Sequence, residues 1–233
     1  MLKMMNIART YQTKTLKTYA LKDFSLDVES GEFVAVTGPS GSGKSTFLNI
    51  AGLLDNFNEG EYWLDEEKMQ GLSDDTLSSI RNQKLGFIFQ SYNLIPDFTL
   101  FENIEMPLRY RKMTRKERTI RIESSLDKVG LLGRSNYLPA ELSGGQQQRV
   151  AIARALAGTP KVLLADEPTG NLDSLMSRQI MEILHQLNDD GMTIIMVTHN
   201  PEQAREVKRQ IQIVDGKIMD YGVYSPLKKQ ATV

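Results

Sequence analysis

The sequence predicts an α/β fold with a largely parallel central sheet, an antiparallel N-terminal part and an inserted helical segment. Short apolar runs typical of buried parallel strands recur along the chain, and helical patterns alternate with them. Between about residues 99 and 157 the pattern is helical only. With 233 residues, of which 40% are hydrophobic and 24% charged, the chain can bury the core of such a fold.

Eight segments are expected to form strands. Residues 1–9 and 20–28 make the N-terminal part, and the second of them ends at the turn Glu29-Ser30-Gly31. Buried parallel strands are predicted at 33–37, 86–89, 162–165 and 193–197. The runs 210–214 and 217–221 flank Asp215-Gly216, which predicts a hairpin.

Helix signals divide the chain further. A helix is expected from Lys44 to Leu53, and the capping box that begins at Thr114 and ends at Glu117 starts another, which runs to Val129 and stops at Gly130. We therefore expect a single domain over residues 1–233. Its α/β core covers about 1–98 and 158–233, and its helical subdomain covers about 99–157.

A glycine-rich run follows the strand predicted at 33–37: Gly38-Pro39-Ser40-Gly41-Ser42-Gly43-Lys44-Ser45. A strand before it and a helix after it are the context that a phosphate-binding P-loop requires. Its glycines let successive N–H groups and the positive end of the helix point at one anion. The motif predicts that Lys44 reaches the β- and γ-phosphates and that the Ser45 hydroxyl binds Mg²⁺. A glycine-rich turn without a ligand is the alternative.

Two carboxylates stand together at the end of the apolar run 162–165. Asp166 at this position suits a Mg²⁺ ion, and Glu167 beside it suits the activation of an attacking water. A strand that simply ends in a polar turn would look similar, but the P-loop on the same type of sheet favours the catalytic interpretation. A second glycine motif, Leu142-Ser143-Gly144-Gly145-Gln146, starts a helix and is either a cap or an anion site.

Composition excludes several other classes. The formal net charge of −1 offers no electrostatic reason to expect a nucleic-acid partner. Without cysteine the chain has neither disulfides nor thiolate metal sites, which fits a reducing cytoplasm. No run approaches the ~20 apolar residues needed to cross a bilayer, so any membrane role is expected to act through a partner.

Taken together, these motifs resemble the nucleotide-binding cassette of ABC transporters. The match in order and spacing covers nearly the whole chain and includes 38–45, Gln90, 142–146, Asp166-Glu167, 171–173 and His199. The runs 142–156 and 164–173 are most similar to one branch, which contains the ATPase subunits of lipoprotein-releasing systems, macrolide exporters and the cell-division pair. The resemblance implies a P-loop NTPase (RecA-like) core carrying a helical signature subdomain.

The resemblance also implies roles for individual residues. Tyr11 would stack on adenine, Gln90 would meet the Mg²⁺ shell and the water, and His199 would contact the γ-phosphate. The implied catalytic set is Lys44, Gln90, Glu167 and His199, and the implied metal set is Ser45, Gln90 and Asp166. The implied ATP contacts are Tyr11, Gly38, Pro39, Ser40, Gly41, Ser42, Gly43, Lys44, Ser45, Thr46, Ser143, Gly144, Gly145 and Gln146.

Partners follow from the same resemblance. Two copies of the chain would face each other head to tail around two ATP molecules, with the signature motif of each over the ATP of the other and Asp173 between them. A separate integral membrane permease would be driven from the cytoplasmic face of the plasma membrane, with a periplasmic adaptor as an optional further partner. The loop after Gln90 is apolar, with Tyr92, Leu94 and Ile95, and is either core or a surface for that permease.

The expected function is thus ATP hydrolysis coupled to an exporter or to mechanotransmission. An importer ATPase is an alternative, because import and export differ more in the permease than in this subunit. A non-transport ABC ATPase is a second alternative, although the long heptad insertion of repair-type relatives and the two cassettes of ribosome-associated ones do not occur here. A GTPase switch protein would need the guanine-reading run Asn-Lys-x-Asp, which is absent.

Overall fold

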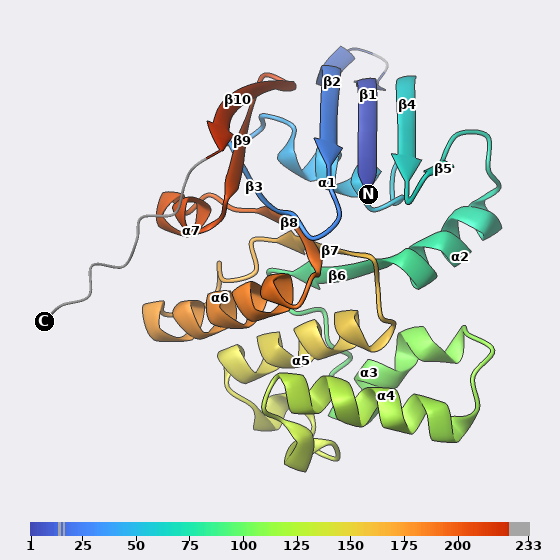
Figure 1. Ribbon diagram of the computed structural model, residues 1–233, viewed down its shortest axis with the longest axis vertical. Coiled ribbons are helices and arrows are strands. Elements are labelled where there is room, and N and C mark those ends of the chain that lie inside the picture. Colours follow the sequence, from blue (N-terminus) through green and yellow to red (C-terminus); the bar gives the residue numbers. More distant parts are fainter. Residues whose placement is uncertain (14, 16, 224–233) are drawn as a thin grey trace, which may run out of the picture.

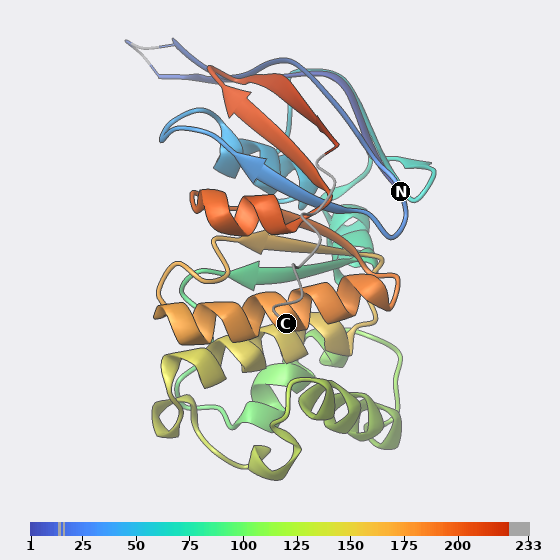
Figure 2. The same ribbon diagram turned by 60° about the vertical axis from the view of Figure 1, so that its left-hand side comes forward.

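The structure is a computed structural model that describes residues 1–223 except 14 and 16. It is built in layers, which Figures 1 and 2 show from two directions. An antiparallel sheet lies at one end, a mainly parallel sheet crosses the middle, and a group of helices forms the other end. Among the described helices, none combines the length and apolarity that crossing a bilayer requires.

The antiparallel sheet has four strands in the order β2-β1-β4-β5. Their bounds are Lys17–Val28, Leu2–Gln12, Glu59–Leu64 and Glu67–Lys68. Strand β1 pairs with β2 on one side and with β4 on the other, and bulges interrupt both ladders. This sheet carries the end of β1, where Tyr11 lies, close to the first helix of the core.

The central sheet has six strands in the order β10-β9-β3-β8-β7-β6. In the same order, starting from β10, their bounds are Lys217–Val223, Arg209–Val214, Phe33–Thr37, Thr193–Val197, Val162–Asp166 and Leu85–Phe89. All neighbours are parallel except β10, which forms a hairpin with β9. The parallel strands therefore end at one edge of the sheet, and the loops that follow them are brought together there.

Seven α-helices connect these strands in the described residues. They are α1 (Lys44–Ala51), α2 (Asp74–Lys84), α3 (Leu100–Arg109), α4 (Arg115–Lys128), α5 (Gly144–Ala157), α6 (Ser174–Asp189) and α7 (Pro201–Glu206). Most begin at a side-chain cap, and Thr99, Thr114 and Ser143 each form a full capping box with the residue three positions on. Helices α3, α4 and α5 form the lower layer of Figure 1.

The central sheet has a hydrophobic core on each face. Alternation along β3 sends Phe33 and Ala35 to the core shared with α3 to α6, and Val34 and Val36 to the core under the antiparallel sheet. In that second core the rings of Phe24 and Phe47 are 5.1 Å apart. A strand buried on both faces needs apolar residues at every position, which explains the continuous apolar runs in the sequence.

The predicted fold class is confirmed, and most of the predicted elements are found. The strands at 33–37 and 193–197, the capping box at Thr114 and the C-terminal hairpin form as expected. The helix from Lys44 was predicted too long: it ends at Ala51, and Leu53 has a φ of 57°. The predicted strand 1–9 was too short, since β1 continues to Gln12.

Candidate active site

Four loops meet at the carboxyl edge of the central sheet. They follow β3 at Gly38, β6 at Gln90, β7 at Glu167 and β8 at Thr198. In open α/β sheets this edge is where ligands bind. The P-loop, Gln90, the acidic pair and His199 therefore lie around one region, although they are spread over more than 160 residues of sequence.

The P-loop has a backbone that only glycine can supply at two positions. Gly38 and Gly43 have φ values of 146° and 109°. A Cβ atom on Gly38 would lie 2.2 Å from the carbonyl oxygen of Ile213, and one on Gly43 would lie 2.4 Å from that of Ala20. Because both obstacles are backbone atoms, the loop is packed tightly between β2 and β9, and its shape is set before any ligand binds.

The polar groups of this loop suit a phosphate. Helix α1 begins at Gly43 without a side-chain cap, so its first N–H groups face outwards from the end of the helix. The buried Ser42 hydroxyl has no hydrogen-bond partner among the described residues. The Lys44 ammonium lies back on the loop, donating to the carbonyls of Gly38 and Pro39 at 2.9 and 2.8 Å. These groups together form a cradle for an anion.

The acidic pair lies at the end of β7, as the sequence predicted. Burial raises the pKa of the Asp166 carboxyl above its ordinary value, the charge of Glu167 raises it further, and the Lys44 ammonium acts in the opposite direction. Two carboxylates and one lysine therefore share this region. A carboxylate that is costly to ionise alone favours a bound cation, so the residues fit Mg²⁺.

Glu167 has an unusual backbone and a specific partner. Its φ is 47°, a region that residues other than glycine rarely occupy, and its N–H donates to the carbonyl of Val197 at 2.9 Å. Its Oε2 lies 2.7 Å from Nδ1 of His199 and accepts the backbone N–H of the same residue at 3.2 Å. The structure thus brings the two predicted catalytic residues into direct contact.

Gln90 is held by a residue on the loop after β7. Its Nε2 donates to Oδ1 of Asn171 at 3.1 Å, and Nδ2 of Asn171 donates back to the Gln90 carbonyl at 3.0 Å. A Cβ atom on Gly170 would lie 2.6 Å from Gln90 Nε2. This reciprocal pair links the loop after β6 with the loop after β7, and the sequence analysis did not predict it.

The second glycine motif forms the start of α5. Ser143 caps the helix, and its own N–H donates to the side-chain oxygen of Gln146 at 3.1 Å. Cβ atoms on Gly144 and Gly145 would lie 2.8 Å from the Tyr92 hydroxyl and 2.6 Å from the Met176 sulfur. Within the described residues, this motif makes no hydrogen bond or ion pair with the P-loop of the same chain.

Tyr11 is fixed in orientation by two residues that the sequence analysis missed. Its hydroxyl donates to Oδ2 of Asp55 at 2.5 Å. Arg9 pairs with the other oxygen of Asp55 at 2.6 Å, and its guanidinium carbon lies 4.5 Å from the centre of the Tyr11 ring. Arg9 and Tyr11 are two positions apart on one strand and so share a face, which is the signal that could have revealed this cluster.

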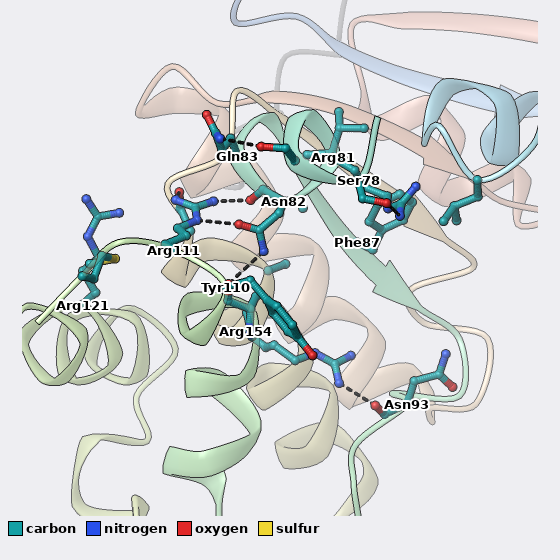
Figure 3. A pocket seen from close by; sticks show the side chains of 18 of the residues that line it. Ser78, Arg81, Asn82, Gln83, Phe87, Asn93, Tyr110, Arg111, Arg121 and Arg154 are labelled. Atoms are coloured by element: carbon teal, nitrogen blue, oxygen red, sulfur yellow. Dashed lines mark hydrogen bonds between the residues drawn. The ribbon is translucent and has the colours of Figure 1, made fainter. Parts of the chain in front are cut away.

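A large cleft of about 1170 Å³ opens between β6 with α2 and the layer of α3 to α5. Figure 3 shows its side chains, among them Arg111 directed at Asn82 and Arg154 directed at Asn93. Arg111 also donates to the Gly158 carbonyl at 2.7 Å. Within the described residues neither arginine pairs with a carboxylate, and burial lowers the pKa of both guanidinium groups. The ring of Tyr110, 80% exposed, stands at this cleft.

The apolar loop after Gln90 borders the cleft and is partly core. Leu94 and Phe101 pack against the lower hydrophobic core, which is one of the two alternatives that the sequence left open. Tyr92 and Asn93 have φ values of 59° and 51°. Arg154, on α5, donates to both of their carbonyls. The loop is therefore attached to the same helix that begins with the second glycine motif.

The fold and this site define a P-loop ATPase in which a nucleotide cradle, an acidic pair and a histidine share one sheet edge. The family model described as ABC transporter matches residues 21–170. The chain belongs to this family. It is an ATP-binding subunit that hydrolyses ATP.

Relatives extend over nearly the whole chain. The uncharacterized ABC transporter ATP-binding protein MJ0796 of Methanocaldococcus jannaschii is 49% identical, over 94% of this chain and 95% of its own length. YvrO of Bacillus subtilis, described in the same words, is 46% identical over 94% and 96%. The macrolide export ATP-binding/permease protein MacB of Escherichia coli is 46% identical over 94% of this chain, which spans only 34% of MacB.

A solved structure agrees with the same assignment. The dimeric post-hydrolysis structure of the ATP-binding cassette MJ0796 bound to ADP and Pi superposes with a TM-score of 0.87. It is 45% identical, and the match covers 97% of this chain and 100% of that one. The predicted family membership, fold and ATPase activity are thereby confirmed.

Proposed function

We propose that this chain hydrolyses ATP with Mg²⁺ at the edge of its central sheet, as one half of a head-to-tail homodimer that drives a separate membrane permease. The observation that carries the catalytic part is the contact of Glu167 with His199 at the end of β7, beside Asp166 and the P-loop. The dimer is supported by the relative MJ0796, whose solved structure is dimeric with ADP and Pi.

The P-loop and the metal-binding residues handle the charge of the nucleotide. Lys44, released from the carbonyls of Gly38 and Pro39, pairs with the terminal phosphates, and the N–H groups at the start of α1 bind the others. Ser45, Asp166 and Gln90 hold the Mg²⁺. When bound, this ion neutralises charge on the phosphate oxygens. Tyr11, oriented by Asp55 and Arg9, supplies a stacking face for the base.

Glu167 and His199 act on the reacting groups. The Glu167 carboxylate accepts a hydrogen bond from the attacking water and takes its proton as the new bond to the γ-phosphorus forms. The bond between the γ-phosphorus and the bridging oxygen breaks in the same step, and ADP leaves with its electron pair. In the described conformation one oxygen of this carboxylate is already engaged by His199. When the His199 ring turns to the γ-phosphate, that oxygen loses its imidazole partner, keeps only the backbone N–H of His199 and can accept a hydrogen bond from the water. The position of His199 therefore couples the presence of the γ-phosphate to the state of the Glu167 carboxylate.

The second glycine motif completes the site of another copy. Ser143, Gly144, Gly145 and Gln146 form an anion site at the start of α5, and among the described residues they make no hydrogen bond or ion pair with their own P-loop. A second copy facing the first around a twofold axis would place each motif over the ATP of its partner. ATP binding would close this dimer and hydrolysis would reopen it.

The permease is proposed to dock in the cleft of Figure 3 from the cytoplasmic face of the plasma membrane. The cleft joins the loop after Gln90 with the signature helix α5, so movement at the ATP site reaches it. MacB, whose name covers both ATP-binding and permease functions, supports an exporter. An importer-type permease, or a non-transport role, is the alternative, and a periplasmic adaptor would belong to the permease.

The catalytic proposal is tested with Glu167→Gln. An amide keeps the shape of the carboxylate but cannot take the proton of the water, so turnover should fall at least about a hundredfold. ATP binding should be retained, and size-exclusion chromatography with ATP and Mg²⁺ should show a stable dimer. A variant that stays monomeric and hydrolyses ATP at the normal rate would sink both the general-base role and the ATP-bound dimer.

The docking proposal is tested with Tyr110→Glu, because this ring is exposed at the cleft and touches none of the catalytic residues. The basal ATPase rate and melting temperature of the isolated subunit should stay as in the wild type, and co-purification with the permease should be lost. Leu94→Glu is the contrasting variant: since Leu94 packs against the core, it should lower the melting temperature. Normal permease binding by Tyr110→Glu would move the docking surface elsewhere.

A further inference from the structure

One buried amide joins the signature helix to the loop that carries Glu167. Gln148 lies on α5, five residues after Ser143, and its side chain is fully buried. Its Nε2 donates to the carbonyl of Pro168 at 2.5 Å. Because Pro168 directly follows Glu167, this hydrogen bond connects the helix that contacts a partner's ATP with the proposed general base of its own site.

The orientation of this amide is determined by chemistry. The Pro168 carbonyl can only accept a hydrogen bond, so the nitrogen of the Gln148 side chain must face it. The amide oxygen then points elsewhere, and it has no hydrogen-bond partner in the described part of the chain. An unpaired buried acceptor destabilises the folded state, because it has lost its hydrogen bonds to water without gaining others. A methionine of similar length would fill the same space and remove the unpaired oxygen, although it would leave the Pro168 carbonyl without a donor. Stability alone therefore does not explain a glutamine here.

The turn that Gln148 holds is a strained one. Glu167 has a φ of 47°, and such a conformation in a residue other than glycine persists only where its surroundings enforce it. Three contacts do so. The N–H of Gly170 donates to the Glu167 carbonyl at 3.0 Å, the Thr169 hydroxyl donates to Gln203 on α7 at 2.9 Å, and Gln148 holds Pro168 between them.

The same network reaches the loop after β8 that carries His199, called the histidine loop below. Oε1 of Gln203 accepts the Thr198 hydroxyl at 3.5 Å as well as that of Thr169, and Thr198 directly precedes His199. Gln203 and Thr198 are both buried. The turn after β7 is therefore held by α5 on one side and by α7 with the histidine loop on the other, and it cannot move independently of either.

We propose that Gln148 is a positioning residue for ATP hydrolysis, which sets the direction of the Glu167 carboxylate from α5. This inference rests on the proposed roles of Glu167 and of the signature motif. A shift of α5, when Ser143 and the glycines engage the ATP of the partner, is transmitted through the amide to Pro168 and hence to Glu167. Each Glu167 is thus placed best for hydrolysis when the signature helix of its own chain is seated on the other ATP.

The test is Gln148→Met, which keeps the length of the side chain and removes its donor. The turnover number should fall about tenfold, a loss that a misplacement of a catalytic group readily produces. The KM and the Kd for ATP should stay within about twofold of the wild type, because Gln148 is not part of the nucleotide cradle. The melting temperature should change little, because the variant removes one unpaired buried acceptor, the Gln148 amide oxygen, and leaves another, the Pro168 carbonyl. The ATP-bound dimer should persist longer before hydrolysis reopens it.

Gln147→Met is the matched control. Gln147 is the neighbouring glutamine on the same helix, and among the described residues its amide donates only to the Leu142 carbonyl, at 3.2 Å. This variant should hydrolyse ATP at the wild-type rate. A loss of the same size in both variants would show a general effect on α5 and would overturn the proposal.

Other outcomes also decide the question. An unchanged turnover number in Gln148→Met would overturn the proposal, as would a loss of ATP binding and of melting temperature that accompanies the loss of rate. Failure of both Gln148→Met and Gln148→Leu to fold would show that the residue serves the fold. Glu167→Gln is measured in parallel: if it hydrolyses ATP normally, the proposed function itself fails, whereas an inactive Glu167→Gln beside a normal Gln148→Met refutes this inference alone.

Discussion

At the scale of single residues, the site is organised around carboxylates in unequal surroundings. Asp166 is half-buried next to a second acid, and both burial and the Glu167 charge raise its pKa. Glu167, one residue further, is instead held by His199 through its side chain and by Val197 through its backbone. These unequal surroundings support different proposed tasks for adjacent residues at the end of one strand, Asp166 at the metal and Glu167 at the water.

A pH dependence of stability follows for Asp166. Because the pKa of Asp166 is raised in the folded protein, the folded state keeps this proton at pH values where the unfolded chain has lost it. The contribution of Asp166 to stability therefore declines as the pH rises from the ordinary aspartate pKa through the raised value. Asp166→Asn should therefore melt a few degrees higher than the wild type at neutral pH without nucleotide, while its ATPase activity is lost.

The gain should disappear below the ordinary aspartate pKa of about 3.9, where the wild-type carboxyl is protonated in both states. Melting curves measured across this range by circular dichroism provide the check. Asp127→Asn, at an exposed position on α4, is the control and should show no such pH-dependent gain. A lower melting temperature for Asp166→Asn at neutral pH would contradict the argument.

Base selectivity is the second prediction at this scale. Tyr11 offers a stacking face held by Asp55 and Arg9, and a π face tolerates any base. Tyr11→Ala should weaken binding of ATP and GTP by the same factor, about 5- to 160-fold for the loss of about 1–3 kcal/mol of stacking. Tyr11→Phe, which keeps the ring, is the control. Loss of ATP affinity with GTP affinity intact would mean that Tyr11 reads the base edge.

At the scale of elements, one asparagine on α3 fixes the end of the loop that follows Gln90. Asn103 is buried, and its Oδ1 accepts the N–H of Ile95 at 2.8 Å. Its Nδ2 donates to the carbonyls of Ile95, Phe98 and Thr99 at 3.1, 2.9 and 3.0 Å. The loop has no regular structure of its own, so this side chain replaces the hydrogen bonds that a strand or helix would supply.

Asn103→Ala should therefore be costly. Each buried polar group left unpaired costs about 1–3 kcal/mol, and several lose their partner at once, so a destabilisation of at least about 3 kcal/mol is expected. For a chain of this size that corresponds to a fall of roughly 6–12 °C in melting temperature. Hydrogen exchange should rise first in residues 91–99. A variant as stable as the wild type would show that water or backbone rearrangement satisfies the loop.

At the scale of the whole molecule, the proposed dimer divides the two phosphate motifs of each chain between two ATP sites. In a head-to-tail dimer, each ATP meets the P-loop of one subunit and the signature motif of the other. Lys44→Ala and Ser143→Arg should each abolish hydrolysis when measured alone. In a mixed dimer both defects fall in the same site, and the other site consists of intact parts.

Mixing the two inactive variants in equal amounts should therefore restore ATPase activity, up to roughly a quarter of the wild-type rate, since half of randomly formed dimers are mixed and each has one intact site of two. Mixing Lys44→Ala with Glu167→Gln is the control: both defects then affect different sites, and no activity should return. An ATPase that works as a single chain would show no restoration in either mixture.

Local patterns were sufficient to predict much of this structure. The apolar runs of β3 and β8, the glycine loop and the capping box at Thr114 all depend on neighbouring residues, and each was found where the pattern placed it. The strand β4 and the helix α2 escaped prediction, because Glu59–Leu64 has few apolar residues and Asp74–Lys84 buries none. Their structure depends on pairing with β1 and on packing against the core edge.

The sequence by itself determined the nucleotide chemistry and the family, because a P-loop, an acidic pair and a signature motif are runs of adjacent residues. Only the tertiary structure decided which distant residues meet: Glu167 with His199, Gln90 with Asn171, Tyr11 with Asp55, and Gln148 with Pro168. The physical reason is that parallel strands bring loops far apart in the chain to one sheet edge, and the pairing there is set by the order of the strands, which no local pattern records.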